Sequence, residues 1–119
     1  MAIVYMNDVS IARYIPENQR NTLGYDYSEE LSAAGNGDTV IIPETITGIS
    51  VTLEVTAGAG KIQASTTPVS EIIATEASAV WVDWDNGEVT ATTQDRVSPV
   101  SALRVVNASG TTKMTLRGQ

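Results

Sequence analysis

The chain has 119 residues and a formal net charge of −7, because 14 acidic residues outnumber 7 lysines and arginines. This length allows a single domain. The acidic balance argues against binding of nucleic acid through its phosphates, which requires a basic surface. Histidine and cysteine are absent, which excludes Ser-His-Asp and Cys-His catalytic groups, zinc sites built on these residues, and disulfide bonds.

These missing residue types predict a protein that is not an enzyme and has no cofactor, because the usual side chain for acid–base work near neutral pH is lacking. No apolar run reaches the 18 residues that a membrane span needs. The apolar stretch 1–6 also lacks the basic start and the length of a signal peptide. We therefore expect no membrane partner and no direct contact with nucleic acid.

Residues 1–38 do not alternate between apolar and polar side chains. A helical turn is predicted over 8–15 and ends at Pro16. A short helix is predicted over 29–34, with Ser28 as its N-cap and Gly35 at its end. Asn36-Gly37-Asp38 then marks a boundary.

This first segment nevertheless carries rings and apolar side chains that a solvated tail would not have. We predict an extended N-terminal arm over 1–38 that orders against another subunit, the alternative being disorder until it binds. Half-buried tyrosines suit such contacts. The partner-binding residues expected in the arm are Tyr5, Tyr14, Tyr25, Tyr27, Ile11 and Ile15.

From Thr39 onward, apolar and polar residues alternate between turns. Ile49, Val51, Leu53 and Val55 point one way, and the residues between them point the other. Strands are predicted over 39–42, 49–56, 61–66, 79–85, 88–94, 100–107 and 112–117. This spacing indicates an all-β fold, an antiparallel β-sandwich of about seven strands over 39–119, immunoglobulin-like or jelly-roll-like.

Four turns separate these strands. Gly58-Ala59-Gly60 is predicted to reverse the chain, and Thr67-Pro68 to start a helical turn, with 69–77 as that turn or a loop. Asn86-Gly87 between two alternating runs is the strongest hairpin signal in the sequence. Ser109-Gly110 is predicted to join the last strand pair.

The segment 79–85 places Val80, Val82 and Trp84 on one face, and Trp81 and Asp83 on the other. One tryptophan is therefore expected in the core and the other near the surface. An exposed Trp81 would be a platform for a sugar, but a core or subunit interface is the more common place for such a ring.

Arg104 lies in the apolar run Leu103-Arg104-Val105-Val106. It is predicted to pair with an acidic residue such as Asp83 or Asp95, or to meet a carboxylate of a partner. Together, Trp81 and Arg104 form a candidate oligomer interface.

Asp83, Asp85, Asn86 and Glu88 gather around one turn, and their oxygen atoms are of the type that calcium prefers. Their spacing does not match a twelve-residue calcium loop, and a hairpin with solvated charges explains them as well. No metal is therefore predicted.

The stretch from Gly48 to Leu116 resembles small virion proteins of tailed bacteriophages. The resemblance rests on Gly48-Ile49-Ser50-Val51-Thr52-Leu53, Ala79-Val80-Trp81-Val82-Asp83-Trp84, the turn at Gly87, Pro99-Val100-Ser101-Ala102-Leu103-Arg104 and Ser109-Gly110-Thr111-Thr112-Lys113. It implies a β-sandwich that decorates or cements a capsid, although such proteins also occur in tails and fibres.

The resemblance leads to the hypothesis of a structural virion protein on the capsid surface, assembled in the host cytoplasm. Its expected partners are the major capsid protein, held by the arm, and further copies of itself in a dimer or trimer. The alternative is a glycan- or receptor-binding module of the particle, which would use Trp81 and the acidic turn.

Overall fold

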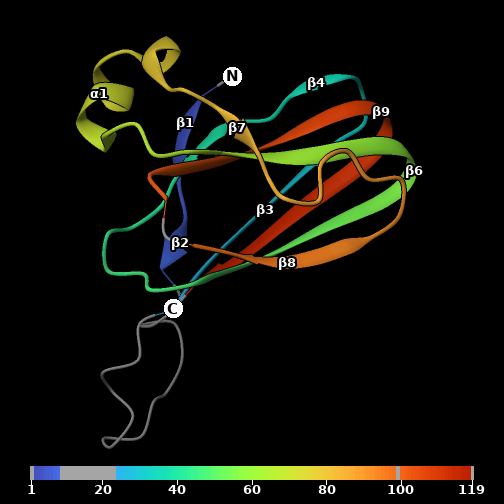
Figure 1. Ribbon diagram of the computed structural model, residues 1–119, viewed down its shortest axis with the longest axis horizontal. Coiled ribbons are helices and arrows are strands. Elements are labelled where there is room, and N and C mark those ends of the chain that lie inside the picture. The colour runs from blue at the N-terminus through green and yellow to red at the C-terminus, as the bar shows by residue number, and fades with distance from the viewer. Residues whose placement is uncertain (1, 9–23, 99, 119) are drawn as a thin grey trace, which may run out of the picture.

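The computed structural model describes residues 2–8, 24–98 and 100–118, and within them the fold is all-β, with nine strands joined in one sheet (Figure 1). The strands are β1 (Ile3–Tyr5), β2 (Asn7–Asp8), β3 (Tyr25–Leu31), β4 (Gly35–Asn36), β5 (Thr39–Ile41), β6 (Ile49–Ser65), β7 (Val82–Asp83), β8 (Thr93–Val97) and β9 (Ala102–Gly118). The helix α1 (Val69–Ala74) and the 3-10 helix η2 (Glu76–Ser78) follow β6. Neither helix of the described part is long and apolar enough to cross a membrane.

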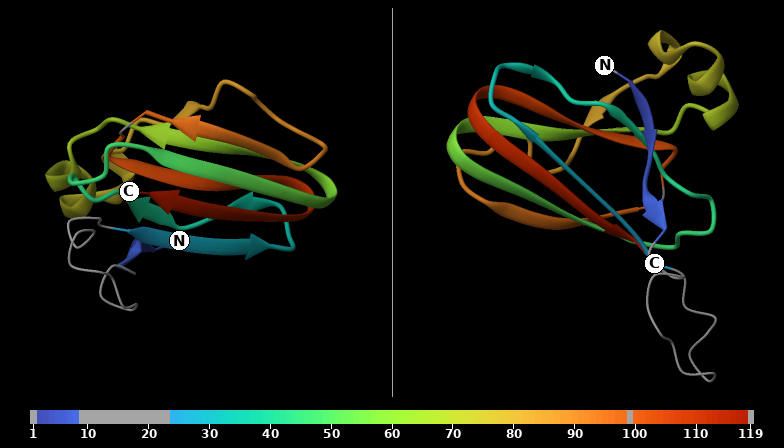
Figure 2. Two further views of the ribbon diagram at one scale, coloured as in Figure 1. Left: turned by 90° about the horizontal axis from the view of Figure 1, so that it is seen from below. Right: turned by 180° about the vertical axis from the view of Figure 1, so that it is seen from behind.

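Two 17-residue strands, β6 and β9, organise the whole sheet. They pair antiparallel along their full length, from Ile49 opposite Gly118 to Ser65 opposite Ala102. The resulting ribbon is folded over at its middle, so that its two halves face each other as the two layers of a sandwich (Figure 2). This is the jelly-roll-like alternative that the sequence left open.

Two glycines lie opposite each other where the ribbon folds. Gly58 has φ 79° and Gly110 has φ 70°, a left-handed conformation that residues with a Cβ adopt at a cost. A Cβ on Gly58 would collide with the backbone of Ser109, and one on Gly110 with the backbone of Ala57. The sequence therefore needs glycine on both strands to turn this corner.

The first layer contains residues 49–55 of β6 and 111–118 of β9, flanked by β8 on one side and by β3 and β2 on the other. The second layer contains residues 60–65 of β6 and 102–107 of β9, flanked by β7, β4, β5 and β1. The main core lies between the layers. Its fully buried side chains include Ile49, Val51, Leu53, Met114 and Leu116 from the first layer and Ile62, Leu103 and Val105 from the second.

A smaller apolar cluster lies on the outer face of the second layer. Ile41 and Ala102, which are paired across β5 and β9, are buried there against Ile72 of α1. Ile3, Val69, Ala79 and Trp81 pack around these three residues. The short helices therefore cover one end of this face, and Trp81 lies at the margin of the covered area.

The segment predicted as an arm contributes strands to the sheet. β3 pairs with seven residues of β9, and β1 pairs with β5 in the one parallel pairing of the described sheet. The helix predicted over 29–34 is therefore wrong, and so is the arm for the described part of 1–38. Pairing with β9 explains the difference, because it places Asp26 opposite Arg117 and Glu30 opposite Lys113.

The three hairpin predictions are also corrected. Residues 58–60 and 109–110 do not reverse the chain into hairpins but bend β6 and β9 at the corner. A turn does form at Asn86-Gly87, since the Gly87 N–H donates to the Trp84 carbonyl at 3.0 Å. After the turn, Val89 still pairs with Gly60 of the second layer. The chain reaches the first layer only beyond that point, where β8 pairs with the other half of β6.

Candidate functional site

The two tryptophans lie on opposite faces, as alternation predicted, and the structure shows which of them is in the core. Trp84 is buried in the main core, where its indole N–H donates to the Gly87 carbonyl at 2.6 Å. Trp81, on the opposite face, lies under the guanidinium of Arg104, with 4.3 Å between the guanidinium carbon and the ring centroid. A stack of this kind is a cation–π contact, which orients both groups on the outside of the second layer.

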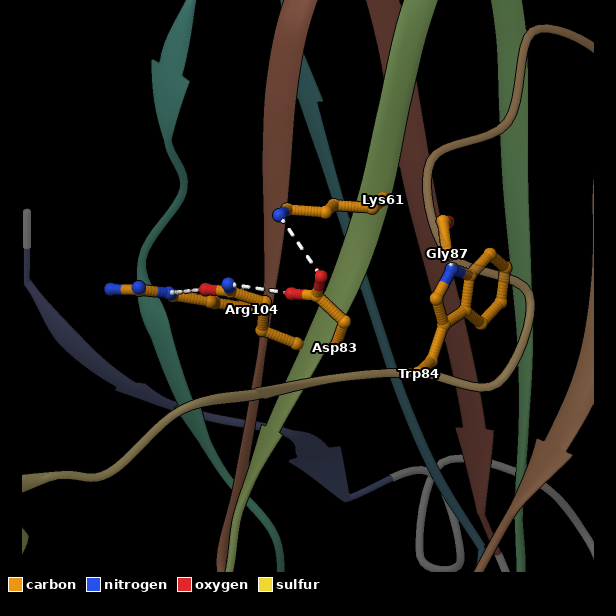
Figure 3. Close-up of polar contacts among 6 residues, drawn as sticks. Lys61, Asp83, Trp84, Gly87 and Arg104 are labelled. Atoms are coloured by element: carbon orange, nitrogen blue, oxygen red, sulfur yellow. Dashed lines mark hydrogen bonds and ion pairs between the residues drawn. The ribbon is translucent and has the colours of Figure 1, made fainter.

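A chain of polar side chains continues from this stack (Figure 3). The Arg104 Nε–H donates to Gln63 Oε1 at 2.8 Å, and Gln63 Nε2 donates to Asp83 Oδ1 at 2.9 Å. Asp83 Oδ2 also accepts from Lys61 Nζ at 3.2 Å. The hydrogen bonds from Gln63 and Lys61 lower the pKa of Asp83.

The predicted ion pair of Arg104 is therefore replaced by an indirect link. Arg104 reaches Asp83 through the amide of Gln63, while Lys61 forms the ion pair with Asp83. Asp95 accepts instead from Asn86 Nδ2 at 2.9 Å. Across the described residues, Arg104 makes no ion pair within 4.0 Å, so its positive charge is not neutralised by direct contact.

A hollow of about 260 Å³ opens beside the stack. Burial lowers the pKa of Arg104, and the negative charge of Glu76 opposes that shift. One oxygen of Glu76, Oε2, is buried without a hydrogen-bond partner. The hollow is lined by Thr39, Glu76, Ala77, Ala79, Trp81 and Arg104.

Two exposed valines flank Trp81 in the sequence. Val80 and Val82 are 68% and 65% exposed, although they flank the partly buried Trp81. Val82 pairs with Ala64, which packs against the main core, but the core does not extend beneath Val82 itself. We name Trp81 and Arg104 on the outer face, together with the exposed neighbours Val80 and Val82 in the same edge segment, the Trp81 surface.

A larger hollow of about 580 Å³ lies near the start of α1. Its walls come from the segment after β5, the segment between β6 and α1, and the start of β9. Glu44 is the one ionisable residue among its lining residues. Those residues are Ile42, Pro43, Glu44, Ile46, Thr66, Pro68, Val69, Ser70, Val100 and Ser101.

A second group of ionisable side chains lies on β3 and beside β5. Burial, with the charges of Glu29 and Asp38, raises the pKa of Tyr27 to about 12. Burial also raises the pKa of Glu29, whose carboxylate accepts from the Asp38 backbone N–H at 3.1 and 3.2 Å. Asp38 in turn accepts from the Ala2 N–H at 3.0 Å. These contacts fasten residue 2 to the sheet and create no nucleophile–base pair.

The predicted partner-binding residues divide into three groups. Tyr5 is 60% exposed on β1 and remains open to a partner. Tyr25 and Tyr27 are partly buried and pack against the main core of their own chain. Tyr14, Ile11 and Ile15 lie outside the described residues.

Sequence reasoning missed two members of the site. Gln63 could have been predicted, because it lies two residues after Lys61 and therefore on the same polar face of β6. Glu76 could not be predicted from the sequence, because the sequence did not decide whether 69–77 forms a helical turn or a loop. In the described part of the chain, no group of three or more acidic residues is placed to hold a metal ion.

No protein-family model and no curated protein matches this chain. Two solved structures are similar to it, one from a study of the mechanism of oxalate oxidase and one of oxalate oxidase in complex with glycolate. Each has a TM-score of 0.55 at 10% identity, and they cover 95% and 96% of this chain. The chain spans about half of these oxidases, 48% in each case. At this identity the similarity shows a shared fold.

A subunit of the disulfide-linked pili called Bacillus endospore appendages is also similar, with a TM-score of 0.43 and 13% identity over 81% of this chain and 86% of that one. What these comparisons establish for this chain is its jelly-roll-like β architecture.

Proposed function

We propose that this protein is a structural component of a bacteriophage particle, which binds the major capsid protein on the outside of the shell and stabilises it. The observation that supports this proposal is the Trp81 surface, where exposed apolar side chains flank a stacked tryptophan and arginine. The resemblance of 48–116 to small virion proteins supplies the identity of the particle. The proposed location is therefore the virion surface.

The composition of the Trp81 surface suits protein binding. Tryptophan and arginine are enriched among the residues that dominate binding energy, especially when neighbouring groups exclude water. Burying a valine side chain contributes about 1.5–3 kcal/mol when burial is complete. Val80 and Val82 stand mostly in solvent and would release water when a partner covers them.

The proposed contact lies on the sheet, because β1 and β3 belong to the sandwich and cannot extend along a coat subunit. Trp81 is also less suited to stacking on a sugar than an open ring would be, since Arg104 covers one of its faces. A glycan-binding module is therefore the second candidate function, and no contact described above favours it. Association of copies into a dimer or trimer through the same surface is part of the proposal.

The test is co-sedimentation with shells assembled from the major capsid protein, comparing the unmodified chain with the double variant V80S/V82S. We expect at least tenfold weaker binding, because about 2 kcal/mol of apolar burial is lost. The matched control is T56A/T115A, which changes two exposed strand residues, Thr115 of the first layer and Thr56 at the bulge beside the corner. Equal binding of all three proteins, with unchanged thermal unfolding, would contradict the proposal.

A further inference from the structure

We propose that the hollow beside Trp81 is a binding site for a single carboxylate group, which the guanidinium of Arg104 holds. The hollow is lined by both side chains and measures about 260 Å³. Ligand pockets for drug-sized molecules typically measure about 300–1,000 Å³. The hollow therefore has room for a functional group at the end of a side chain.

The guanidinium is oriented for this task by two contacts. Its Nε–H is committed to Gln63 Oε1, and its plane lies over the ring of Trp81. Arginine has five N–H donors, and in the described residues only the Nε–H has a hydrogen-bond acceptor. The terminal nitrogens point away from Asp83 (Figure 3). They remain available for the two parallel hydrogen bonds that arginine makes to carboxylates.

The charges around the hollow favour a monoanion. Glu76 lines the same hollow as Arg104, and its negative charge partly offsets the positive charge of Arg104. The empty site is therefore close to neutral. An incoming anion is attracted by Arg104 at short range and repelled by Glu76 and by the net charge of −7. Because the charges of Arg104 and Glu76 nearly cancel, the repulsion that remains comes from the net charge of −7, and it acts twice as strongly on a doubly charged phosphate as on a carboxylate.

This inference deepens the proposed function, because an acidic side chain of a coat subunit or of a second copy could supply the carboxylate. The inference depends on the proposed function only if the carboxylate belongs to a coat subunit or a second copy. A free small carboxylate has the same chemistry, and the experiment separates the two sources.

The test is a titration of the ¹⁵N-labelled protein with sodium acetate up to about 50 mM, with chloride replaced at constant ionic strength to hold screening fixed. The readout is the indole N–H signal of each tryptophan in a nitrogen–proton correlation spectrum. We expect a saturating shift of the Trp81 signal. The Trp84 signal is the internal control, because its indole N–H is held by the Gly87 carbonyl in the core. Phosphate is expected to shift the Trp81 signal less than acetate at equal concentration.

Two variants give effects of opposite sign. R104K keeps the positive charge but loses the planar fork, and we expect acetate to bind at least fivefold more weakly. E76Q removes the repelling charge, and we expect acetate to bind several-fold more tightly. A purely structural role for these residues would not produce the second result. The proposal would be overturned by a Trp81 shift that chloride matches, by unchanged binding in both variants, or by tighter binding of phosphate.

Shell binding then identifies the source of the carboxylate. If R104K weakens co-sedimentation with shells as well as acetate binding, the group comes from a partner polypeptide. If R104K affects acetate alone while V80S/V82S still weakens shell binding, the ligand is a free carboxylate and the proposed function stands. If acetate binds as expected but none of the variants alters shell binding, the hollow is supported and the proposed function fails.

Discussion

At the scale of single residues, the polar side chains of this protein are shared between fastening the sheet and forming the candidate site. Asn107 is an example of the first kind, since it is buried and its Nδ2 donates to the carbonyls of Ala33 at 2.9 Å and Gly110 at 2.8 Å. It therefore joins the loop after β3 to the corner of the ribbon. Asn107-Ala108-Ser109 matches a glycosylation pattern, but this amide is enclosed within the fold.

The opposite pKa shifts of Glu29 and Asp83 lead us to expect opposite effects of pH on the free energy of unfolding. The pKa of Glu29 is raised in the folded state, mainly by burial, so its stabilising effect is present at low pH and is lost as pH rises through that pKa. The pKa of Asp83 is lowered, so its effect is present above the ordinary pKa and is lost as pH falls. Urea unfolding between pH 3 and 7 measures both.

The two matched variants are E29Q and D83N. We expect the stability of the unmodified protein, relative to E29Q, to decrease as pH rises from 4 to 7. Relative to D83N, its stability is expected to increase as pH rises from about 3 to 5, because the lowered pKa of Asp83 makes its effect appear as pH passes the ordinary pKa. Slopes of the same sign for the two variants would show that these contacts do not control the titration of the two carboxyl groups.

At the scale of elements, the corner of the ribbon depends on Gly58 and Gly110. Gly58→Ala combines the cost of a left-handed conformation with a collision against the Ser109 backbone. We expect a loss of about 2–4 kcal/mol in the free energy of unfolding. Gly87→Ala is the matched control, because Gly87 also has positive φ (62°) but open space around its Cα. Its expected loss is about 1 kcal/mol, measured by the same urea unfolding.

The difference in unfolding free energy between Gly58→Ala and Gly87→Ala measures the cost of the collision between the new Cβ and the Ser109 backbone. If Gly58→Ala costs no more than Gly87→Ala, the two strands have room to separate at the corner. The fold would then not depend on close approach of the two backbones there.

Local patterns in the sequence predicted some elements and misassigned others. Alternation over 49–56 placed Ile49, Val51 and Leu53 in the core, and the structure confirms it, because both periodicity and burial are properties of the strand itself. The Asn-Gly turn was also predicted, but not which strands it joins. Turn residues determine local conformation, whereas pairing of β7 and β8 with distant halves of β6 is decided by the whole sheet.

The misassigned helix over 29–34 has a similar cause. Glu29, Glu30 and the cap at Ser28 favour a helix locally, and the charges of Lys113 and Arg117 that pair with β3 lie at the other end of the chain. For the candidate site, sequence analysis indicated Trp81 and Arg104 and that the two tryptophans lie on opposite faces, but not which of them is in the core. It could not indicate the hollow, since that depends on η2 packing beside β9.

At the scale of the whole molecule, the described part of residues 1–31 (2–8 and 24–31) belongs to the sandwich and cannot be removed without damage. Deletion of residues 1–31 eliminates β1, β2 and β3, and with them Tyr25, Tyr27 and Leu31, which pack against the core. Loss of these three partly buried side chains alone removes about 3 kcal/mol, from a total stability of about 5–15 kcal/mol for a typical domain.

We therefore expect the deleted protein to lose cooperative thermal unfolding, measured by near-ultraviolet circular dichroism. Tyr5→Ser is the control and should unfold as the unmodified chain does, since Tyr5 is largely exposed. A sharp transition of unchanged midpoint in the deleted protein would show that β3 is dispensable.

The continuous course of β6 and β9 through both layers has a mechanical consequence. In a sandwich of independent sheets, load that enters through one sheet reaches the other through side-chain packing. Here each long strand crosses from one layer to the other, so tension applied at the second layer passes into the first along covalent backbone. If the protein is anchored through Trp81, we therefore expect the two layers to resist separation by force, because breaking them apart would stretch the covalent backbone of β6 and β9.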